Sequence, residues 1–150
     1  MPQSLSQVLI HLVYSTKGRT NWLHEDVQPR LHAYLSRVLA NGGHVPIIVG
    51  GHTDHVHMFF GISRTVTIAK VVESTKVSSS KWLKEEFPAM HEFGWQLGYG
   101  AFSVSPSDQK AVVAYIARQK EHHGDVSFED EFRCLLEEFG VRYDERYVWD

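Results

Sequence analysis

Two histidines, His55 and His57, occupy alternate positions in the stretch 53–62. Side chains alternate between the two faces of a β-strand, so both imidazoles would point the same way, with Cα atoms roughly 6–7 Å apart. The opposite face would be a continuous apolar row of Val56, Met58, Phe60 and Ile62. Two imidazoles at that separation can bind one metal ion from the same side. A His-rich exposed face, in a chain with ten histidines, is the other interpretation of this stretch taken alone.

A tyrosine and a glutamine, Tyr115 and Gln119, are four residues apart in a segment predicted to be helical, which places them on one helical face. Taken alone, the pair is explained by a tyrosine at the edge of the core and a glutamine on the surface. Beside a His-x-His strand it gains chemistry, because a tyrosine hydroxyl can attack a phosphodiester and form a covalent phosphotyrosine. Its ordinary pKa near 10 makes it a weak nucleophile. A divalent ion held by His55, His57 and the Gln119 amide oxygen could activate the phosphate.

The remaining pattern predicts the elements that must position these residues. Apolar alternation predicts strands at 8–15, 45–49, 55–62 and 95–104, with the second and third joined as a hairpin. Apolar stripes and end signals predict helices after Pro29 and at 67–87, 105–123 and 127–139.

The order β-α-β-β-α-β-α-α predicts an α+β fold, a ferredoxin-like or RRM-like sandwich. We expect an antiparallel sheet of four to five strands with helices packed on one face. His55 and His57 would then point out of the open second face, or toward whatever covers it.

Length and composition predict one globular domain spanning residues 1–150, with 43% hydrophobic residues. No apolar run is long enough for a membrane span, and no signal-peptide pattern is present, so we expect no membrane association. Cys134 is the only cysteine, which excludes an intrachain disulfide and favours a cytoplasmic location. Its apolar neighbours predict a buried structural thiol.

Charge is unevenly distributed, although the net charge is only −3. The segment 64–84 carries five basic residues and one acid, whereas 121–150 carries ten acids and three arginines. This basic middle keeps a phosphate-binding face possible. The candidate contacts to phosphate groups are Lys17, Arg19, Lys70, Lys76, Lys81, Lys84 and Arg118.

Other histidines have weaker claims to the site. His11 could face it from the first strand, and His52 lies in the turn before the His-x-His strand. His122 and His123 lie at a predicted helix end, where positive charge is favourable, and are not expected to be ligands.

Four stretches together carry a family resemblance: 15–19, 54–57, 95–105 and Tyr115-Ile116-Ala117-Arg118-Gln119. The chain resembles the HUH endonucleases with a single tyrosine. The resemblance is greatest to small transposases of the IS200/IS605 type and their REP-associated tyrosine transposase relatives. A lone His-x-His would be a weak signal, whereas the joint spacing over residues 15–119 is specific.

The resemblance implies an RRM-like homodimer that binds imperfect hairpins at the ends of a single-stranded DNA element. His55, His57 and Gln119 would hold Mg²⁺ or Mn²⁺. Tyr115 would be the catalytic nucleophile, cleaving and rejoining single-stranded DNA through a 5′-phosphotyrosine and a free 3′-OH. In the family the tyrosine helix often completes the partner subunit's site, so the sequence leaves open whether Tyr115 acts in cis or in trans.

Two alternatives remain at this point. The protein could be a REP-associated transposase that acts on genomic repeats rather than on its own element. It could also be a non-catalytic RRM-like nucleic-acid-binding module, which would need exposed sheet aromatics such as Phe59. A histidine-triad nucleotide hydrolase is disfavoured, because Phe59 occupies the position of a third alternating histidine.

Overall fold

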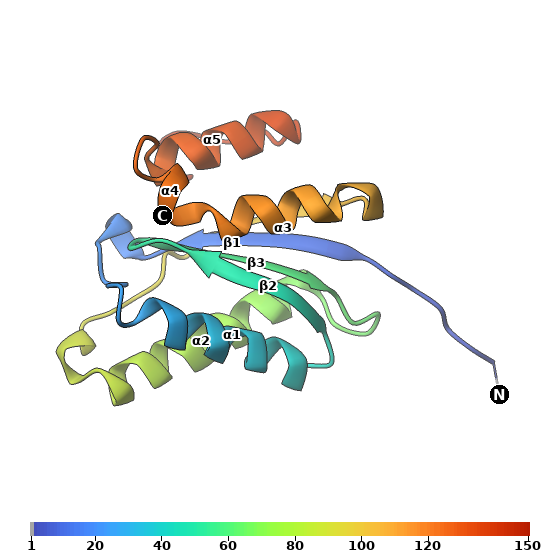
Figure 1. Cartoon of the computed structure of the whole chain (residues 1–150), viewed down its shortest axis with the longest axis horizontal. Coiled ribbons are helices and arrows are strands. Elements are labelled where there is room, and N and C mark those ends of the chain that lie inside the picture. Colours follow the sequence, from blue (N-terminus) through green and yellow to red (C-terminus); the bar gives the residue numbers. More distant parts are fainter. Residues whose placement is uncertain (1) are drawn as a thin grey trace.

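A computed structural model describes residues 2–150 and shows a four-stranded antiparallel sheet between two layers of helices (Figure 1). The strands are β1 (Leu9–Ser15), β2 (Val45–Gly51), β3 (His55–Gly61) and β4 (Gly100–Val104). Their order in the sheet is β2-β3-β1-β4, so β1 and β3 are central and β2 pairs with β3 as the predicted hairpin. The α+β class and the four-stranded antiparallel sheet are confirmed.

One face of the sheet packs on helices α1 (Gln28–Asn41) and α2 (Ile68–Glu86). Thr67 begins α2 by accepting a hydrogen bond from the Lys70 backbone N–H at 3.1 Å. The alternate apolar residues of the two central strands form the floor of this core and are buried: Ile10, Leu12, Tyr14, Val56, Met58 and Phe60. The odd-numbered residues of β1 and β3, including both site histidines, therefore point to the opposite face.

That opposite face is covered by the chain's own C-terminal helices, α3 (Gln109–Ala117), α4 (Gln119–His122) and α5 (Phe128–Glu138), as Figure 1 shows. The sequence analysis placed helices on one face and left this face open or covered by something unassigned, whereas helices cover both faces. The cover has a physical reason, because the apolar stripe of α5 must be buried. Its members pack against Val13 and Phe102 of the sheet: Phe128, Phe132, Leu135 and Leu136.

Two glycines allow these helices to approach the sheet closely. A Cβ atom on Gly50 would lie 2.9 Å from the carbonyl oxygen of Ile116 in α3. One on Gly100 would lie 2.5 Å from the Phe132 ring in α5. Larger residues at these positions would force α3 and α5 away from the strands.

The C-terminal half differs from the prediction in two local features. The segment 105–123, predicted as one helix, begins as a 3₁₀ turn (Pro106–Asp108) and breaks at Arg118, whose φ of −101° and ψ of 17° separate α3 from α4. Strand β4 is shorter than the predicted 95–104, since Trp95 makes only an isolated bridge with Thr16.

Among residues 2–150, no helix is long and apolar enough to cross a membrane.

The central core predicts a large effect on stability at Leu12, which is fully buried in β1. We expect Leu12→Ala to lower the free energy of unfolding by about 2–5 kcal/mol, because it removes buried methyl groups and leaves a cavity. Urea denaturation measures this change. Leu97, which is 87% exposed, is the matched control, and Leu97→Ala should change stability by less than about 0.5 kcal/mol. Equal effects of the two substitutions would contradict this placement of the core.

Candidate active site and metal centre

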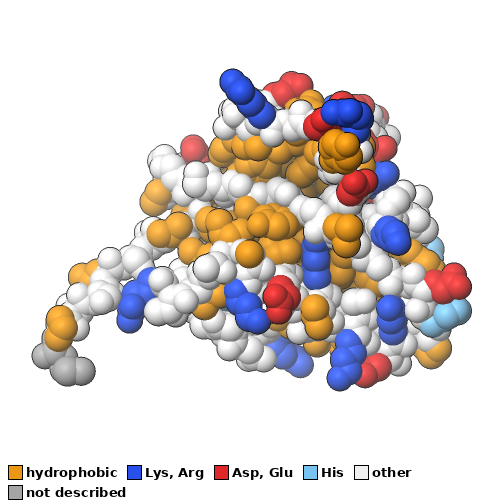
Figure 2. All heavy atoms as spheres, turned by 180° about the vertical axis from the view of Figure 1, so that it is seen from behind, with side chains coloured by type: hydrophobic (Ala, Val, Ile, Leu, Met, Phe, Trp, Pro, Cys, Tyr) orange, Lys and Arg blue, Asp and Glu red, His pale blue; other side chains and the backbone are white. Residues whose placement is uncertain are grey.

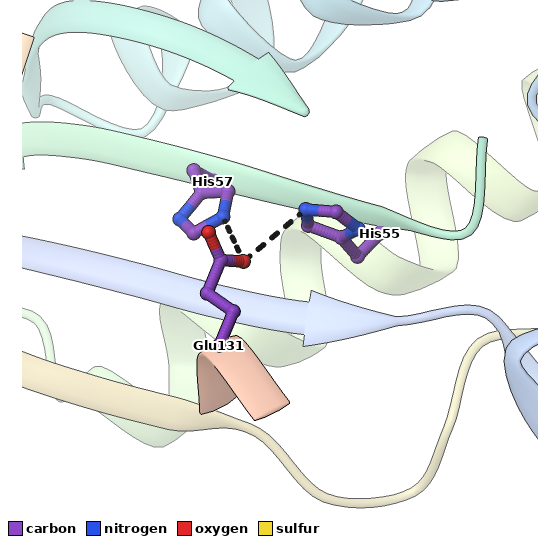
Figure 3. Close-up of side chains that lie close together, drawn as sticks. All are labelled: His55, His57 and Glu131. Atoms are coloured by element: carbon purple, nitrogen blue, oxygen red, sulfur yellow. Dashed lines mark hydrogen bonds and ion pairs between the residues drawn. The ribbon is translucent and has the colours of Figure 1, made fainter. Parts of the chain in front are cut away.

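Strand β3 holds His55 and His57 side by side on the covered face, and both side chains are fully buried. The Glu131 side chain of α5 extends toward both, as Figure 3 shows. Its Oε1 lies 3.0 Å from His57 Nε2 and 3.4 Å from His55 Nε2. The two histidines predicted from the sequence therefore face a buried carboxylate rather than solvent.

Helices α3 and α4 bring the second predicted pair to the same place. The Gln119 side chain is buried, and its Oε1 lies 2.8 Å from His55 Nε2. Tyr115 is half-buried and its hydroxyl donates a short hydrogen bond to Glu131 Oε2. Tyr115, Gln119, His55 and His57 thus meet within one chain, with the break at Arg118 turning Gln119 inward.

Glu131 is the residue of this site that the sequence analysis missed. It is only 3% exposed, and within residues 2–150 its carboxylate contacts no Lys or Arg. A signal was present in the sequence, because Glu131 interrupts the apolar stripe of α5 one position before Phe132. An acidic residue on the buried stripe of a helix is costly unless it has partners, which makes it a candidate functional group.

Hydrogen bonds at the outer ring nitrogens orient two imidazoles toward the centre. His55 Nδ1 lies 2.7 Å from the Asp54 carboxylate, and His123 Nδ1 lies 2.5 Å from the Val126 carbonyl oxygen. Because both of these oxygens accept, each Nδ1 carries a proton and each Nε2 faces the centre of the group. His57 Nδ1 lies 2.7 Å from His11 Nε2, so His11 fixes the orientation of the third imidazole.

His123 belongs to this cluster, contrary to the expectation that it only ends a helix. Its Nε2 lies 3.0 Å from Gln119 Oε1 and 3.1 Å from Glu131 Oε1. His122 Nε2 is 3.4 Å from Glu131 Oε2 at the outer side of the group. After the break at Arg118, the short helix α4 ends at His122 and brings both histidines to Glu131, an effect of the break that a continuous helical period does not reveal.

This donor set fits a divalent metal ion. One ligand atom each from His55, His57 and Glu131 lie within 4.8 Å of one another, and His122, His123 and Glu131 form a second such group that shares the carboxylate. Imidazole nitrogens, a carboxylate and an amide oxygen are all metal ligands. Several of these atoms carry electron pairs that face one another here, so a proton or a cation is required between them. The Asp54–His55 contact is the usual outer support of a metal-binding histidine.

The electrostatics of the cluster follow from burial and from Glu131. Burial would raise the pKa of Glu131, but hydrogen bonds from His123 and His57 lower it well below its usual range. Burial and then the Glu131 charge raise the pKa of Tyr115, so its hydroxyl is protonated at neutral pH. Burial, with the neighbouring His57, lowers the pKa of His11 to about 3 and keeps its ring neutral.

The buried histidines predict that the folded protein loses stability as the pH falls. Burial lowers the pKa of His11 from 6.5 to about 3 and that of His32 from 6.5 to about 4. Below pH 6.5 the unfolded chain binds protons that the folded chain does not, so the stability present above pH 6.5 is lost as pH falls. We expect a loss of about 2 kcal/mol per histidine at pH 5, measured by urea denaturation at pH 7 and pH 5.

A substitution at His32 measures how much this residue contributes to the loss of stability in acid, apart from the histidines around Glu131. Its Nε2 is buried with no hydrogen-bond partner in the described chain, so His32→Leu removes a titrating group without breaking a hydrogen bond. The variant should show a smaller loss of stability between pH 7 and pH 5 than the unmodified protein. An unchanged loss would contradict the assignment to His32.

A cavity of about 530 Å³ connects the cluster to solvent between α3 and α5. Its inner end is formed by His11, Tyr115, His122 and Glu131. Apolar side chains gather below the upper helical layer on this side of the molecule (Figure 2). Cys134, predicted to be buried, is exposed and lines this cavity, because it lies on α5 beside the apolar stripe rather than within it.

The predicted DNA-contacting residues are dispersed relative to the cluster. The four lysines of α2 lie on the helical layer across the sheet from His55 and His57, where Figure 2 shows Lys and Arg side chains. Lys76 donates to the carbonyl oxygens of Gln96, Leu97 and Gly98, and burial lowers its pKa to about 8.

Some of the other candidate basic residues already bind groups of the protein, whereas others are exposed. Lys70 pairs with Glu73 at 3.1 Å, and Arg19 donates to the Trp149 carbonyl oxygen at 3.0 Å. Lys81 and Lys84 line a shallow depression of about 590 Å³ beside residues 95–97. Arg118 is exposed at the junction of α3 and α4, on the same side of the sheet as Tyr115.

Comparisons with known proteins agree with this geometry. The family described as "Transposase IS200 like" matches residues 4–119. No curated protein sequence matches the chain. A crystal structure described as a transposase from Deinococcus radiodurans R1 has a TM-score of 0.65 and 22% identity, covering 79% of this chain and 98% of its own. A REP-associated tyrosine transposase bound to a REP hairpin has a TM-score of 0.61 and 12% identity, covering 84% of this chain and 74% of its own.

The family match over residues 4–119 defines the chain as a transposase, a class of enzyme that acts on DNA, and the fold agrees with that class. The chain belongs to the IS200-like transposase family, since the family match spans most of its length and includes His55, His57, Tyr115 and Gln119. The resemblance drawn from the sequence motifs is confirmed.

Proposed function

We propose that the protein cleaves and rejoins single-stranded DNA at hairpin-marked sites, with Tyr115 as nucleophile and a divalent metal ion as cofactor. The observation that carries this proposal is the meeting of Tyr115 and Gln119 with His55 and His57 around one buried carboxylate. A structural tyrosine would not need three histidines and a glutamine around its hydroxyl-bonding partner.

The metal ion would be Mg²⁺ or Mn²⁺ held by His55, His57 and Gln119. When bound, such an ion would withdraw charge from a phosphate and favour attack on it. Asp54 and His11 would hold the two imidazoles in the required orientation through their Nδ1 contacts. The cavity between α3 and α5 would admit the DNA strand to the Tyr115 hydroxyl.

In the cleavage step the Tyr115 oxygen would attack the phosphorus of one phosphodiester. A bond from the tyrosine oxygen to phosphorus forms, and the bond from phosphorus to the 3′ oxygen of the preceding nucleotide breaks. The hydroxyl proton leaves the tyrosine, and the departing 3′ oxygen takes up a proton. The products are a 5′-phosphotyrosine and a free 3′-OH. Attack of a 3′-OH on the phosphotyrosine reverses the bond changes and joins strands without an external energy source.

The DNA partner we propose is a single-stranded hairpin, by analogy with the structural relative described as bound to a REP hairpin. Lys17, Lys81, Lys84 and Arg118 would contact the phosphate backbone, and binding would weaken steeply with salt. Lys70, Lys76 and Arg19 would first have to leave the contacts that they make within the protein.

We propose that Tyr115 acts in cis. Its hydroxyl contacts Glu131 of the same chain, which itself contacts His57 of that chain, so one chain supplies every member of the group. The homodimer expected from the family resemblance remains a prediction, and dimerisation would not be needed to complete the site. A reducing cytoplasm would suit the exposed free thiol of Cys134.

Two alternative functions are distinguished in different ways, one by a buried residue and the other by the choice of substrate. A non-catalytic RRM-like module needs exposed aromatics on the sheet, but Phe59 is fully buried beneath the tyrosine helix beside Ile116. Action on scattered genomic repeats, rather than on the protein's own element, remains compatible with the similarity to the REP-associated enzyme. It would be distinguished by comparing repeat-derived hairpins with hairpins from the DNA that flanks the gene.

The test is incubation of the protein with hairpin-bearing single-stranded DNA drawn from its genomic surroundings, with Mn²⁺ or with EDTA. We expect a protein–DNA adduct that survives denaturing electrophoresis, formed with Mn²⁺ and absent with EDTA. Hairpin binding without any adduct over the whole set of substrates would support the non-catalytic module instead.

A further inference from the structure

Glu131 has a distribution of contacts that the proposed metal ligands and nucleophile do not explain. The two carboxylate oxygens face different groups. Oε1 lies 3.0 Å from His57 Nε2, 3.1 Å from His123 Nε2 and 3.4 Å from His55 Nε2. Oε2 accepts hydrogen bonds from the Tyr115 hydroxyl and, at 2.9 Å, from the Gln119 amide.

We infer that Glu131 is a metal ligand beside His55 and His57, binding through Oε1, while its Oε2 holds the Tyr115 hydroxyl. One carboxylate would then link the metal centre to the nucleophile. This inference rests on the proposed function and adds to it the anionic ligand, which comes from a helix outside the residues matched by the family.

Burial supports a ligand over a structural acid. The Glu131 side chain is 2% exposed, and in the described chain its partners are imidazoles, a phenol and an amide, with no Lys or Arg. Removing a carboxylate from water costs several kcal/mol unless a full opposite charge compensates it. A divalent cation held by Oε1 and the imidazoles would supply that charge.

The position of α5 makes the arrangement rigid. Phe132 packs into the space left by Gly100, and Phe128 stacks on the His55 ring with centroids 4.6 Å apart. These contacts fix the helix on both sides of Glu131 and leave its side chain directed at β3, as Figure 3 shows. A ligand on a packed helix holds its geometry better than one on a loop.

The test measures Mn²⁺ binding by calorimetry in the absence of DNA, so that its outcome does not depend on catalysis. We expect Glu131→Gln to weaken Mn²⁺ binding by at least about tenfold, since the amide keeps the size of the side chain but loses its charge. His57→Ala serves as the benchmark for losing a ligand. Glu137→Gln is the matched control, an exposed glutamate on the same helix that should bind Mn²⁺ as the unmodified protein does.

The outcomes separate this inference from the proposed function. Unchanged Mn²⁺ binding by Glu131→Gln, together with a loss in His57→Ala, would overturn the role of Glu131 and leave the histidine site standing. No Mn²⁺ binding by the unmodified protein, or equal binding by His57→Ala, would overturn both. Circular dichroism and thermal unfolding of each variant check that a loss of binding is not a loss of fold, and Glu131→Asp provides a second variant with a shorter carboxylate.

Discussion

Replacement of Tyr115 by phenylalanine is expected to abolish the covalent protein–DNA adduct and to reduce strand cleavage by at least about a thousandfold, because the attacking oxygen is removed. The ring remains, so its contacts beside His57 and His11 should persist. Hairpin binding, measured by electrophoretic mobility shift, should change little. The effect is therefore predicted on chemistry and not on DNA affinity.

Tyr14→Phe is the matched control, since Tyr14 is also buried but hydrogen-bonds to Thr75 on the α2 side of the sheet. We expect it to cleave DNA at the unmodified rate, with a loss of stability of about 1 kcal/mol for the lost hydrogen bond. An adduct that persists in Tyr115→Phe would remove Tyr115 as the nucleophile.

Loss of a proposed metal-binding imidazole should have the next largest effect. We expect His57→Ala to lower strand cleavage by at least about a hundredfold and to weaken Mn²⁺ binding, because it removes one of the two proposed nitrogen ligands on β3. EDTA should reproduce the loss in the unmodified protein, and added Mn²⁺ should restore activity there but not in the variant.

The control for this substitution is His91→Ala, at an exposed histidine far from the cluster in the sequence and outside its hydrogen bonds. It should leave cleavage and Mn²⁺ binding unchanged. Since His57→Ala also removes the hydrogen-bond partner of His11 and one of the partners of Glu131, thermal unfolding must show a folded protein before its activity is interpreted. Full activity of folded His57→Ala would contradict the metal site.

Local periodicity predicted the part of the site that lies on regular elements. The period of two in β3 placed His55 and His57 together on one face, and the alternating apolar residues of β1 and β3 identified the core face of the sheet. These inferences depend on one element at a time, which is why the sequence sufficed. The four-residue spacing placed Tyr115 near Gln119, but the break at Arg118 puts the two residues on different helices, so their meeting also depends on that break.

The rest of the site depends on how distant elements pack. The sequence left the cover of the second face unassigned, and α5 brings Glu131 onto it through the fit of Phe132 against Gly100. The break at Arg118 and the turn after it return His123 to the cluster, which no helical period predicts. The α2 lysines were grouped by sequence, but the sheet separates them from His55 and His57. Only tertiary packing decides such separations.

The most direct measurement of the central claim is peptide mapping of the covalent adduct by mass spectrometry. The unmodified protein would be incubated with Mn²⁺ and the hairpin substrate, digested, and the nucleotide-bearing peptide sequenced. The account predicts a nucleotide attached through a 5′ phosphate to Tyr115 and a free 3′-OH on the other DNA fragment. A nucleotide on any other residue, or cleavage with no adduct at any stage, would contradict it.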